Sequence, residues 1–169
     1  MMKKIIFVLC VALLSATSCL SGGTSPGTST STFTGRLTVS DIATGAVTLT
    51  DNQASVTICI PNIIDPKFDI IFNGVKFSNS PMEPKKNVEV LGIPFTTTVS
   101  EDESSINYVF DGENIIPMIG GVSYEKYTID RIWGCLGKQV DVMFEMWSKS
   151  KRVHFSTVKS DGGSSNTGE

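Results

Sequence analysis

Few side chains in this sequence are of the types that carry out catalysis or bind metal ions. The 169 residues include a single histidine, His154, and four cysteines. One histidine excludes both a catalytic pair of histidines and a multi-histidine metal centre. Neither the phosphate-binding Gly-x-x-x-x-Gly-Lys loop nor the zinc-protease His-Glu-x-x-His motif is present. We therefore expect a protein that is not an enzyme and has no catalytic residues, no metal site and no cofactor.

The positions of the four cysteines limit both zinc binding and disulfide formation. Cys10 lies in the N-terminal apolar segment and Cys19 shortly after it, which leaves Cys59 and Cys135 in the folded part. These two cysteines and His154 cannot supply four zinc ligands without carboxylates. Cys59 has the opposite strand phase from its apolar neighbours, and the segment around Cys135 is expected far away in the fold. We predict that Cys59 and Cys135 are free thiols, not bridged to each other.

For the other candidate side chains, a structural role competes with a functional one. His154 falls on the outward phase of the last strand, which favours a surface histidine over a general base. The carboxylates of 101–103 could bind calcium weakly, but a solvated turn fits them better because the ordered ligand spacing of a calcium loop is missing. Lys85 and Lys86 are read as a charged turn. Trp133 and Trp147 are candidates to hold a sugar or a partner, or to cap the end of the fold.

The N-terminus has the layout of a secretory signal. Lys3 and Lys4 precede a ten-residue apolar run at 5–14. A helix of that length spans about 15 Å, half of a bilayer core, so it is a signal peptide and not an anchor. The residues at 15–19, Ser-Ala-Thr-Ser-Cys, resemble the lipobox of bacterial lipoproteins. We predict a signal peptide at 1–18 and lipid attachment at Cys19; the alternative is ordinary cleavage that leaves a free thiol.

Composition indicates a tether, a folded domain and a C-terminal tail in the rest of the chain. Charged residues make up 18% of the sequence and hydrophobic residues 40%, with a net charge of -3. This balance excludes a nucleic-acid-binding protein and a disordered body. Residues 19–32 are rich in Ser, Thr and Gly, which indicates a lipidated N-terminus followed by a flexible tether. Residues 160–169 are expected to be a disordered tail, so the folded domain is assigned to 33–159.

Hydrophobic periodicity within 33–159 has period two, which indicates strands. The clearest case is the run 140–147, where valine, phenylalanine and methionine occupy alternate positions. Many short alternating strands separated by turns indicate an all-β, mostly antiparallel barrel or a β-sandwich. The residues expected to point inward are Leu37, Val39, Val47, Leu49, Ile58, Ile70, Phe72, Val142, Phe144, Met146 and Phe155.

Recurring Ile-Pro dipeptides and several strand motifs carry a family resemblance. Ile60-Pro61, Ile93-Pro94 and Ile116-Pro117 each follow an apolar run, which marks strand ends. Together with the strand motifs at 33–39 and 127–134, they resemble the calycin-like β-barrel lipoproteins of gut Bacteroidetes. The resemblance implies an up-and-down barrel of about eight strands, similar to lipocalins. The lipocalin Gly-x-Trp is absent, because Arg36 and Leu37 follow Gly35, so a lipocalin ligand is not implied.

Two functions agree with these observations. The first is a lipid-anchored cell-envelope module that binds a small apolar molecule or a glycan near the barrel mouth. The second is a structural or accessory subunit of an outer-membrane assembly that contacts an envelope protein through its loops. The expected location is the outer membrane, on its periplasmic face, with lipidated Cys19 in the bilayer. The bulky inward residues predict a packed barrel with a shallow pocket at one mouth, formed by loops such as 78–87, 100–105 and 111–123.

Overall fold

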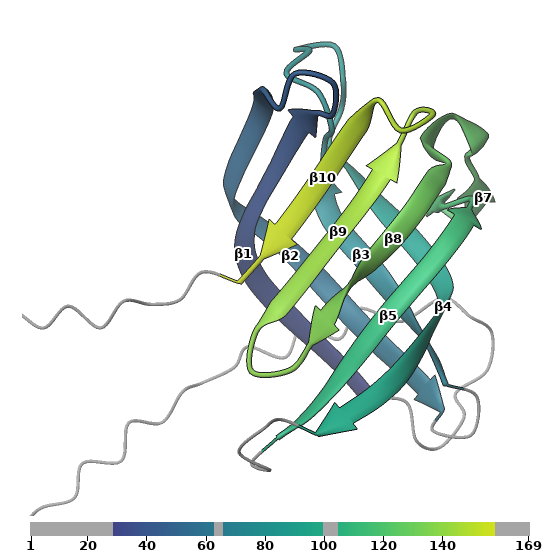
Figure 1. The fold of residues 1–169 in the computed structure, drawn as a ribbon. Coiled ribbons are helices and arrows are strands. Elements are labelled where there is room, and N and C mark those ends of the chain that lie inside the picture. The colour runs from purple at the N-terminus through teal and green to yellow at the C-terminus, as the bar shows by residue number, and fades with distance from the viewer. Residues whose placement is uncertain (1–28, 63–65, 100–104, 158–169) are drawn as a thin grey trace, which may run out of the picture.

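The computed structural model describes residues 29–62, 66–99 and 105–157. Nearly all of them lie in strands or in the turns between strands (Figure 1). The strands are β1 (Ser29–Asp41), β2 (Val47–Asn62), β3 (Lys67–Val75), β4 (Lys86–Val99), β5 (Ile106–Ile115), β6 (Met118–Ile119), β7 (Val122–Ser123), β8 (Ile129–Leu136), β9 (Val140–Met146) and β10 (Lys151–Ser156). The single described helical element is the 3-10 turn Glu125–Tyr127. No helix among the described residues is long and apolar enough to cross a membrane.

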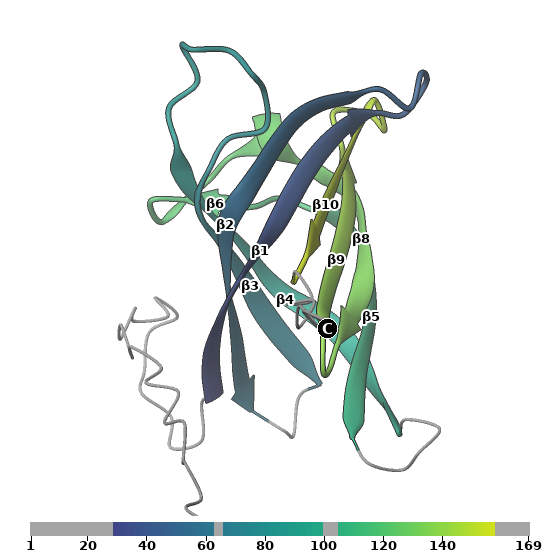
Figure 2. The ribbon, with the colours of Figure 1, turned by 90° about the vertical axis from the view of Figure 1, so that its left-hand side faces the viewer.

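Eight of the ten strands close into one antiparallel barrel. Neighbours in the chain are neighbours in the barrel, in the order β1, β2, β3, β4, β5, β8, β9 and β10, and β10 pairs back onto β1 (Figure 2). The short β6–β7 hairpin is attached to β4 through the pair Glu89 and Met118. The predicted all-β, up-and-down barrel of eight strands is confirmed, and the alternative sandwich is wrong.

The barrel has two different ends, which we name by their position along β1. The proximal mouth is the end where β1 begins at Ser29 and β9 begins at Val140, at the bottom of Figure 1. The distal mouth is the end where the turn 42–46 joins β1 to β2 and the turn 147–150 joins β9 to β10.

The interior is filled by the inward side chains of all eight strands. Alternation places one residue in two inside, and each buried apolar side chain contributes about 1.5–3 kcal/mol to stability. Ten of the eleven residues predicted to point inward are buried. The bulkiest of them include Phe72, Phe144 and Phe155, which are at most 1% exposed. The predicted packed interior is therefore confirmed.

Aromatic rings form two connected series, one toward each mouth. In the distal series Phe144 contacts Phe72 and Phe77 at centroid distances of 5.2 and 5.7 Å, and Phe77 contacts Tyr127 at 5.8 Å. In the proximal series Phe68 contacts Phe110 at 5.1 Å and Phe95 at 5.7 Å. Phe95 in turn contacts Tyr108 at 5.3 Å. The two series connect the core to two different sets of side chains at the barrel ends.

Some details of the sequence-based prediction are wrong. Val47, predicted to be inside, is 60% exposed because it is the first residue of β2, beyond the end of the core. The tether was assigned up to residue 32, yet β1 begins at Ser29. Residues 111–123 were expected to form a loop, but β5 continues to Ile115, and Asp111 and Gly112 lie within it. A Cβ on Gly112 would lie 3.1 Å from Ile115 Cδ1 and 3.3 Å from Ile132 Cγ2, so a larger residue there would have to displace these side chains slightly.

One Ile-Pro pair does not end a strand. Pro94 lies in the middle of β4, opposite Lys67 of β3. The ladder between β3 and β4 ends at this pair, and from Phe95 onward β4 pairs with β5. A proline is tolerated there because the strand exchanges partners at that point and the missing N–H interrupts neither ladder.

Candidate ligand-binding pocket

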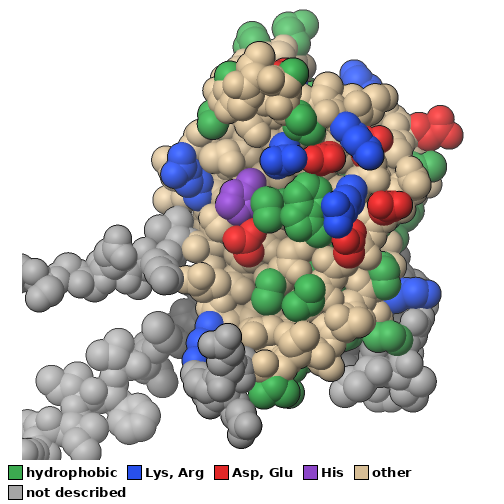
Figure 3. All heavy atoms as spheres, viewed as in Figure 1, with side chains coloured by type: hydrophobic (Ala, Val, Ile, Leu, Met, Phe, Trp, Pro, Cys, Tyr) green, Lys and Arg blue, Asp and Glu red, His purple; other side chains and the backbone are tan. Residues whose placement is uncertain are grey.

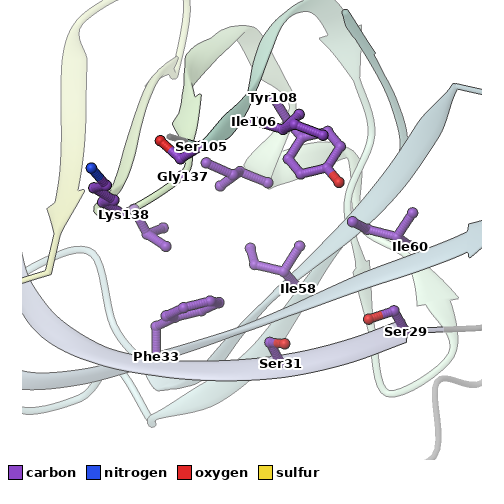
Figure 4. A pocket seen from close by; sticks show the side chains of 12 residues that line it. Ser29, Ser31, Phe33, Ile58, Ile60, Ser105, Ile106, Tyr108, Gly137 and Lys138 are labelled. Carbon is purple, nitrogen blue, oxygen red and sulfur yellow. The ribbon is translucent and has the colours of Figure 1, made fainter. Parts of the chain in front are cut away.

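An apolar pocket of about 430 Å³ lies at the proximal mouth. We call it the proximal pocket. Pockets of about 300–1,000 Å³ with mainly apolar walls are the usual sites of small-molecule binding. The side chains that line it come from β1, β2, β5, β8 and β9 and the adjoining turns (Figure 4). They belong to Ser29, Ser31, Phe33, Ile58, Ile60, Ser105, Ile106, Tyr108, Leu136, Gly137, Lys138 and Val140.

One wall of the pocket is formed by β1 and β2. Their register places Ser29 opposite Ile60 and Ser31 opposite Ile58. The inward positions of β1 continue from Leu37 through Phe33 to the two serines, so small hydroxyl side chains stand where a bulky residue would fill the barrel. The space of the pocket follows from this choice of side chains.

The opposite wall is formed by β5, β8 and β9. Tyr108 of β5 pairs with Leu136 of β8, and Leu136 pairs with Val140 of β9. In Figure 4 the side chains of Tyr108 and Ile106 stand across the opening from Ile58 and Ile60. Ile106 is 58% exposed and adds apolar surface to this side of the opening.

Toward the barrel interior, the pocket ends at the packed core. Tyr108 rests against Phe95, and that ring belongs to the proximal aromatic series. On β1, Gly35 lies so close to β10 that a Cβ would meet the carbonyl oxygen of Ser156 at 2.3 Å and the ring of Phe155 at 2.9 Å. The ring of Phe155 therefore fills space beside a glycine, and the pocket is confined to the mouth.

The lining defines which ligands the pocket can hold. Aliphatic and aromatic surfaces dominate, and the hydroxyl groups of Ser29, Ser31 and Tyr108 supply neutral hydrogen-bonding groups at the opening. Lys138 adds one basic side chain to the lining, so the surface fits an elongated apolar molecule with a polar end. Of the three loops predicted to govern binding, 100–105 contributes Ser105 here, and its other residues lie outside the described part of the chain.

His154, Cys59 and Cys135 do not line this pocket. His154 is on the outer face of β10 and its Nε2 is 3.0 Å from Asp141 Oδ1. Cys135 is a free thiol. Its pKa is raised, by burial first and then by the negative charge of Asp141, which disfavours the reactive thiolate. These groups give no nucleophile with a base aimed at it.

The prediction for Cys59 is right in one respect and wrong in another. Because Cys135 is free, the two cysteines are not bridged to each other, as expected. Cys59, however, forms a disulfide, and its partner lies outside the described residues. Its outward strand phase did not make it accessible, since it is only 1% exposed. Cys19 and the carboxylates of 101–103 also lie outside the described residues.

The two tryptophans occupy different surroundings. Trp133 is on the outer face of the β8–β9–β10 wall, where an apolar centre is ringed by charged side chains (Figure 3). The guanidinium carbons of Arg131 and Arg152 are 5.1 and 5.8 Å from its ring centroid. Trp147 packs against the core at the distal mouth, which is the capping role considered from the sequence.

The two lysines at 85–86 have different surroundings. Lys85 is exposed and 3.8 Å from a carboxylate oxygen of Asp51, as expected for a charged turn. Lys86 is drawn inside and hydrogen-bonds to Tyr127 Oη, 41 positions further along the chain. A contact of that sequence separation has no local pattern, so sequence analysis missed it. Among the described residues, no three His, Cys, Asp or Glu side chains gather as a metal site would require.

Comparison with known proteins yields no relative for this chain. No family model matches it, and neither a curated protein nor a solved structure is detectably similar. The site must therefore be interpreted from its own geometry.

Proposed function

We propose that this protein is a lipid-anchored module of the cell envelope that binds a small, elongated apolar molecule in the proximal pocket. The observation that carries the proposal is the proximal pocket itself, an open apolar surface on an otherwise packed barrel. An acyl chain, with several methylene groups in a row, has the shape and polarity that this lining accommodates. Each methylene group transferred from water contributes about 0.8 kcal/mol.

The position of the pocket relative to the predicted anchor supports the same proposal. Ser29 lines the pocket and lies ten positions after Cys19. The Ser, Thr and Gly content of the segment between them predicts a flexible chain, and a flexible chain of ten residues reaches about 17 Å. If Cys19 is in the outer leaflet or periplasmic leaflet of an outer membrane, the proximal mouth is held close to the bilayer. A membrane-derived apolar ligand would then have a short path into the pocket. The relation to calycin-like lipoproteins of Bacteroidetes remains part of this proposal.

Binding is tested with a fluorescent fatty-acid probe and the Cys19→Ser protein, which lacks the predicted lipid. We expect stoichiometric binding in the micromolar range, because a shallow pocket buries only part of the chain. Ser31→Phe fills the pocket from its β1 wall and should weaken binding at least about tenfold. The matched control is Thr34→Phe, on the same strand but on the exposed outward phase. Equal binding by all three proteins, or no binding, would contradict the proposal and leave the accessory-subunit function.

Lipid attachment requires a separate test because a sulfur atom that carries a thioether cannot also form a disulfide. Cys59 is disulfide-bonded in the structure of the full-length chain, and Cys135 is free. If residues 1–18 are removed as a signal peptide, Cys19 is the one cysteine left that could pair with Cys59, so that disulfide and lipid attachment at Cys19 exclude each other. Peptide mapping of the mature, unreduced protein should find a diacylated or triacylated peptide that begins at Cys19. A peptide that joins Cys19 to Cys59 would exclude the lipid anchor, while the apolar pocket would be unaffected by that result.

A further inference from the structure

A second pocket, of about 500 Å³, lies at the distal mouth. We call it the distal pocket. Its walls come from the segment between β3 and β4, the segment before β8, and the end of β9. The side chains that shape its chemistry are Ser78, Glu83, Lys86, Tyr124, Tyr127 and Trp147. None of them lines the proximal pocket, so the two sites are separate.

Three aromatic rings form a continuous surface in the distal pocket. Tyr124 and Tyr127 are stacked, with centroids 5.5 Å apart and planes at 28°. Tyr127 and Trp147 are 6.0 Å apart with planes at 41°. Tyr127 is 4% exposed and is fixed against the core by Phe77, whereas Tyr124 is 43% exposed. A fixed central ring with a more open ring beside it offers an aromatic face to a ligand.

Trp147 is held in place by an unusual turn. It and the next two residues, Ser148 and Lys149, have φ values of 57, 55 and 59°, in the left-handed region that residues with a Cβ rarely adopt. Two hydrogen bonds hold the turn: Trp147 Nε1 donates to the carbonyl oxygen of Lys126 at 2.9 Å, and the N–H of Lys149 donates to Asp130 at 2.8 Å. Strained backbone that the surroundings enforce is concentrated at functional sites. Here it orients an indole toward a pocket.

Beneath the rings lies a hydrogen-bonded charged pair. Lys86 Nζ donates to Tyr127 Oη at 2.5 Å, and Tyr127 Oη donates to Glu83 Oε1 at 2.9 Å. Lys86 and Glu83 are also 3.4 Å apart, with side chains 15% and 11% exposed. Ser78 Oγ donates to the second oxygen of Glu83 at 2.5 Å. The pair is balanced in charge and offers both donors and acceptors in one fixed arrangement.

We propose that the distal pocket binds a pyranose ring of a carbohydrate. One face of a pyranose carries C–H groups whose partial positive charge matches the negative face of an aromatic ring. Its edge carries hydroxyl groups that both donate and accept hydrogen bonds, so they can pair with the remaining donor of Lys86 and the remaining lone pairs of Glu83 and Ser78. Lys86 Nζ lies over the ring of Tyr127, 4.3 Å from its centroid, so the sugar would contact the more exposed ring of Tyr124 and the indole of Trp147. Trp133 lies on the outer wall and does not line this pocket. The proposal does not depend on the apolar ligand of the proximal pocket.

The test uses Trp147 as its own reporter. The chain has two tryptophans, so Trp133→Phe leaves Trp147 as the one source of indole fluorescence. In that background, oligosaccharides of neutral hexoses, of N-acetylhexosamines and of uronic acids are titrated to about 10 mM, since a single sugar site of this openness binds weakly. We expect at least one class to shift the emission in a saturable way. No shift with any class would overturn the proposal and leave the distal pocket as a protein contact.

Two substitutions then place the sugar. Tyr124→Ala removes the more exposed ring without disturbing the core. Trp147→Ala removes the indole, and binding to this variant is measured by calorimetry because its fluorescent reporter is gone. Each should weaken binding at least about tenfold. Trp133→Ala is the matched control and should leave the affinity unchanged, and Ser31→Phe should block the fatty-acid probe but not the sugar. Sugar binding that survives both Tyr124→Ala and Trp147→Ala would place the site elsewhere and overturn the proposal.

Discussion

The two mouths of the barrel are built on the same eight strands but differ in chemistry. At the proximal mouth the strands supply most of the lining, and the small inward residues Ser29 and Ser31 leave an apolar opening. At the distal mouth the connecting segments supply it, and they bring aromatic rings and a charged pair together. The comparison shows that strand pairing fixes where a site can be, whereas the residues at the strand ends and in the connections decide what it holds.

The largest expected effect is on the core shared by both mouths. Phe144→Ala removes a ring that is 1% exposed and contacts both Phe72 and Phe77. It should lower the free energy of unfolding by about 3–5 kcal/mol, the usual cost of such a cavity. Urea denaturation measures it. The loss should also weaken sugar binding at the distal pocket more than probe binding at the proximal pocket, because Phe77 supports Tyr127. A loss under about 1 kcal/mol would contradict the assigned packing.

The same substitution at one serine from each mouth should give different results. Ser78→Ala removes the hydroxyl that donates to Glu83, and should cost about 1 kcal/mol of stability because a partly buried carboxylate loses a donor. Ser31→Ala, at an exposed inward position of β1, should change stability by less than about 0.5 kcal/mol. Urea denaturation of both variants under one set of conditions makes the comparison. Equal costs would show that the two mouths are not organised differently.

A smaller effect concerns the response of the two ends to acid. Burial would raise the pKa of Glu83, but hydrogen bonds from Ser78, Tyr127 and the N–H of Phe77, with the charge of Lys86, outweigh it and hold the pKa below its ordinary value. Burial raises the pKa of Asp69, which lies near the start of β3, despite a hydrogen bond from the N–H of Gly92. The two carboxyls therefore act in opposite directions.

The signs follow from the linkage between protonation and folding. The contribution of Glu83 is present above its unfolded-state pKa and is lost as the pH falls through its lower folded-state pKa. Asp69 disfavours folding at neutral pH, and that cost disappears as the pH falls through its raised folded-state pKa. Glu83→Gln should thus reduce the loss of stability in acid, and Asp69→Asn should raise stability at pH 7 with little effect below pH 4. Melting temperatures of the two variants and the unmodified protein across this pH range measure both effects. Effects of the opposite sign would contradict both assignments.

The smallest expected effect is on the outer wall between the mouths. Arg152 is 2.7 Å from Glu145 and lies over Trp133, but its side chain is 45% exposed. Arg152→Ala should cost between about 0 and 1 kcal/mol, as exposed ion pairs do. Probe and sugar affinities should both remain at their original values. A change in either affinity would extend that site onto the outer wall.

Much of the fold could be predicted from local pattern, and most of the two sites could not. Alternation at Leu37, Val39 and Phe144 predicts strands and a core because a buried face requires period two. The inward serines of β1 carry no hydrophobic signal, and only continuation of the phase from Leu37 through Phe33 would have placed Ser31 inside. Lys86 and Tyr127 are 41 positions apart and meet only in the folded barrel, which no local pattern encodes.

The pairing of β10 with β1 has a consequence for how the chain folds. Every other ladder of the barrel joins consecutive strands, whereas this one joins residues such as Asp41 and Lys151, which are 110 positions apart. Closing so long a loop costs more chain entropy than forming any hairpin, and contacts of high sequence separation slow folding. The seven consecutive ladders can form one after another as an open, curved sheet. We expect closure between β1 and β10 to be the late event, with the apolar inner face accessible to other chains until it occurs.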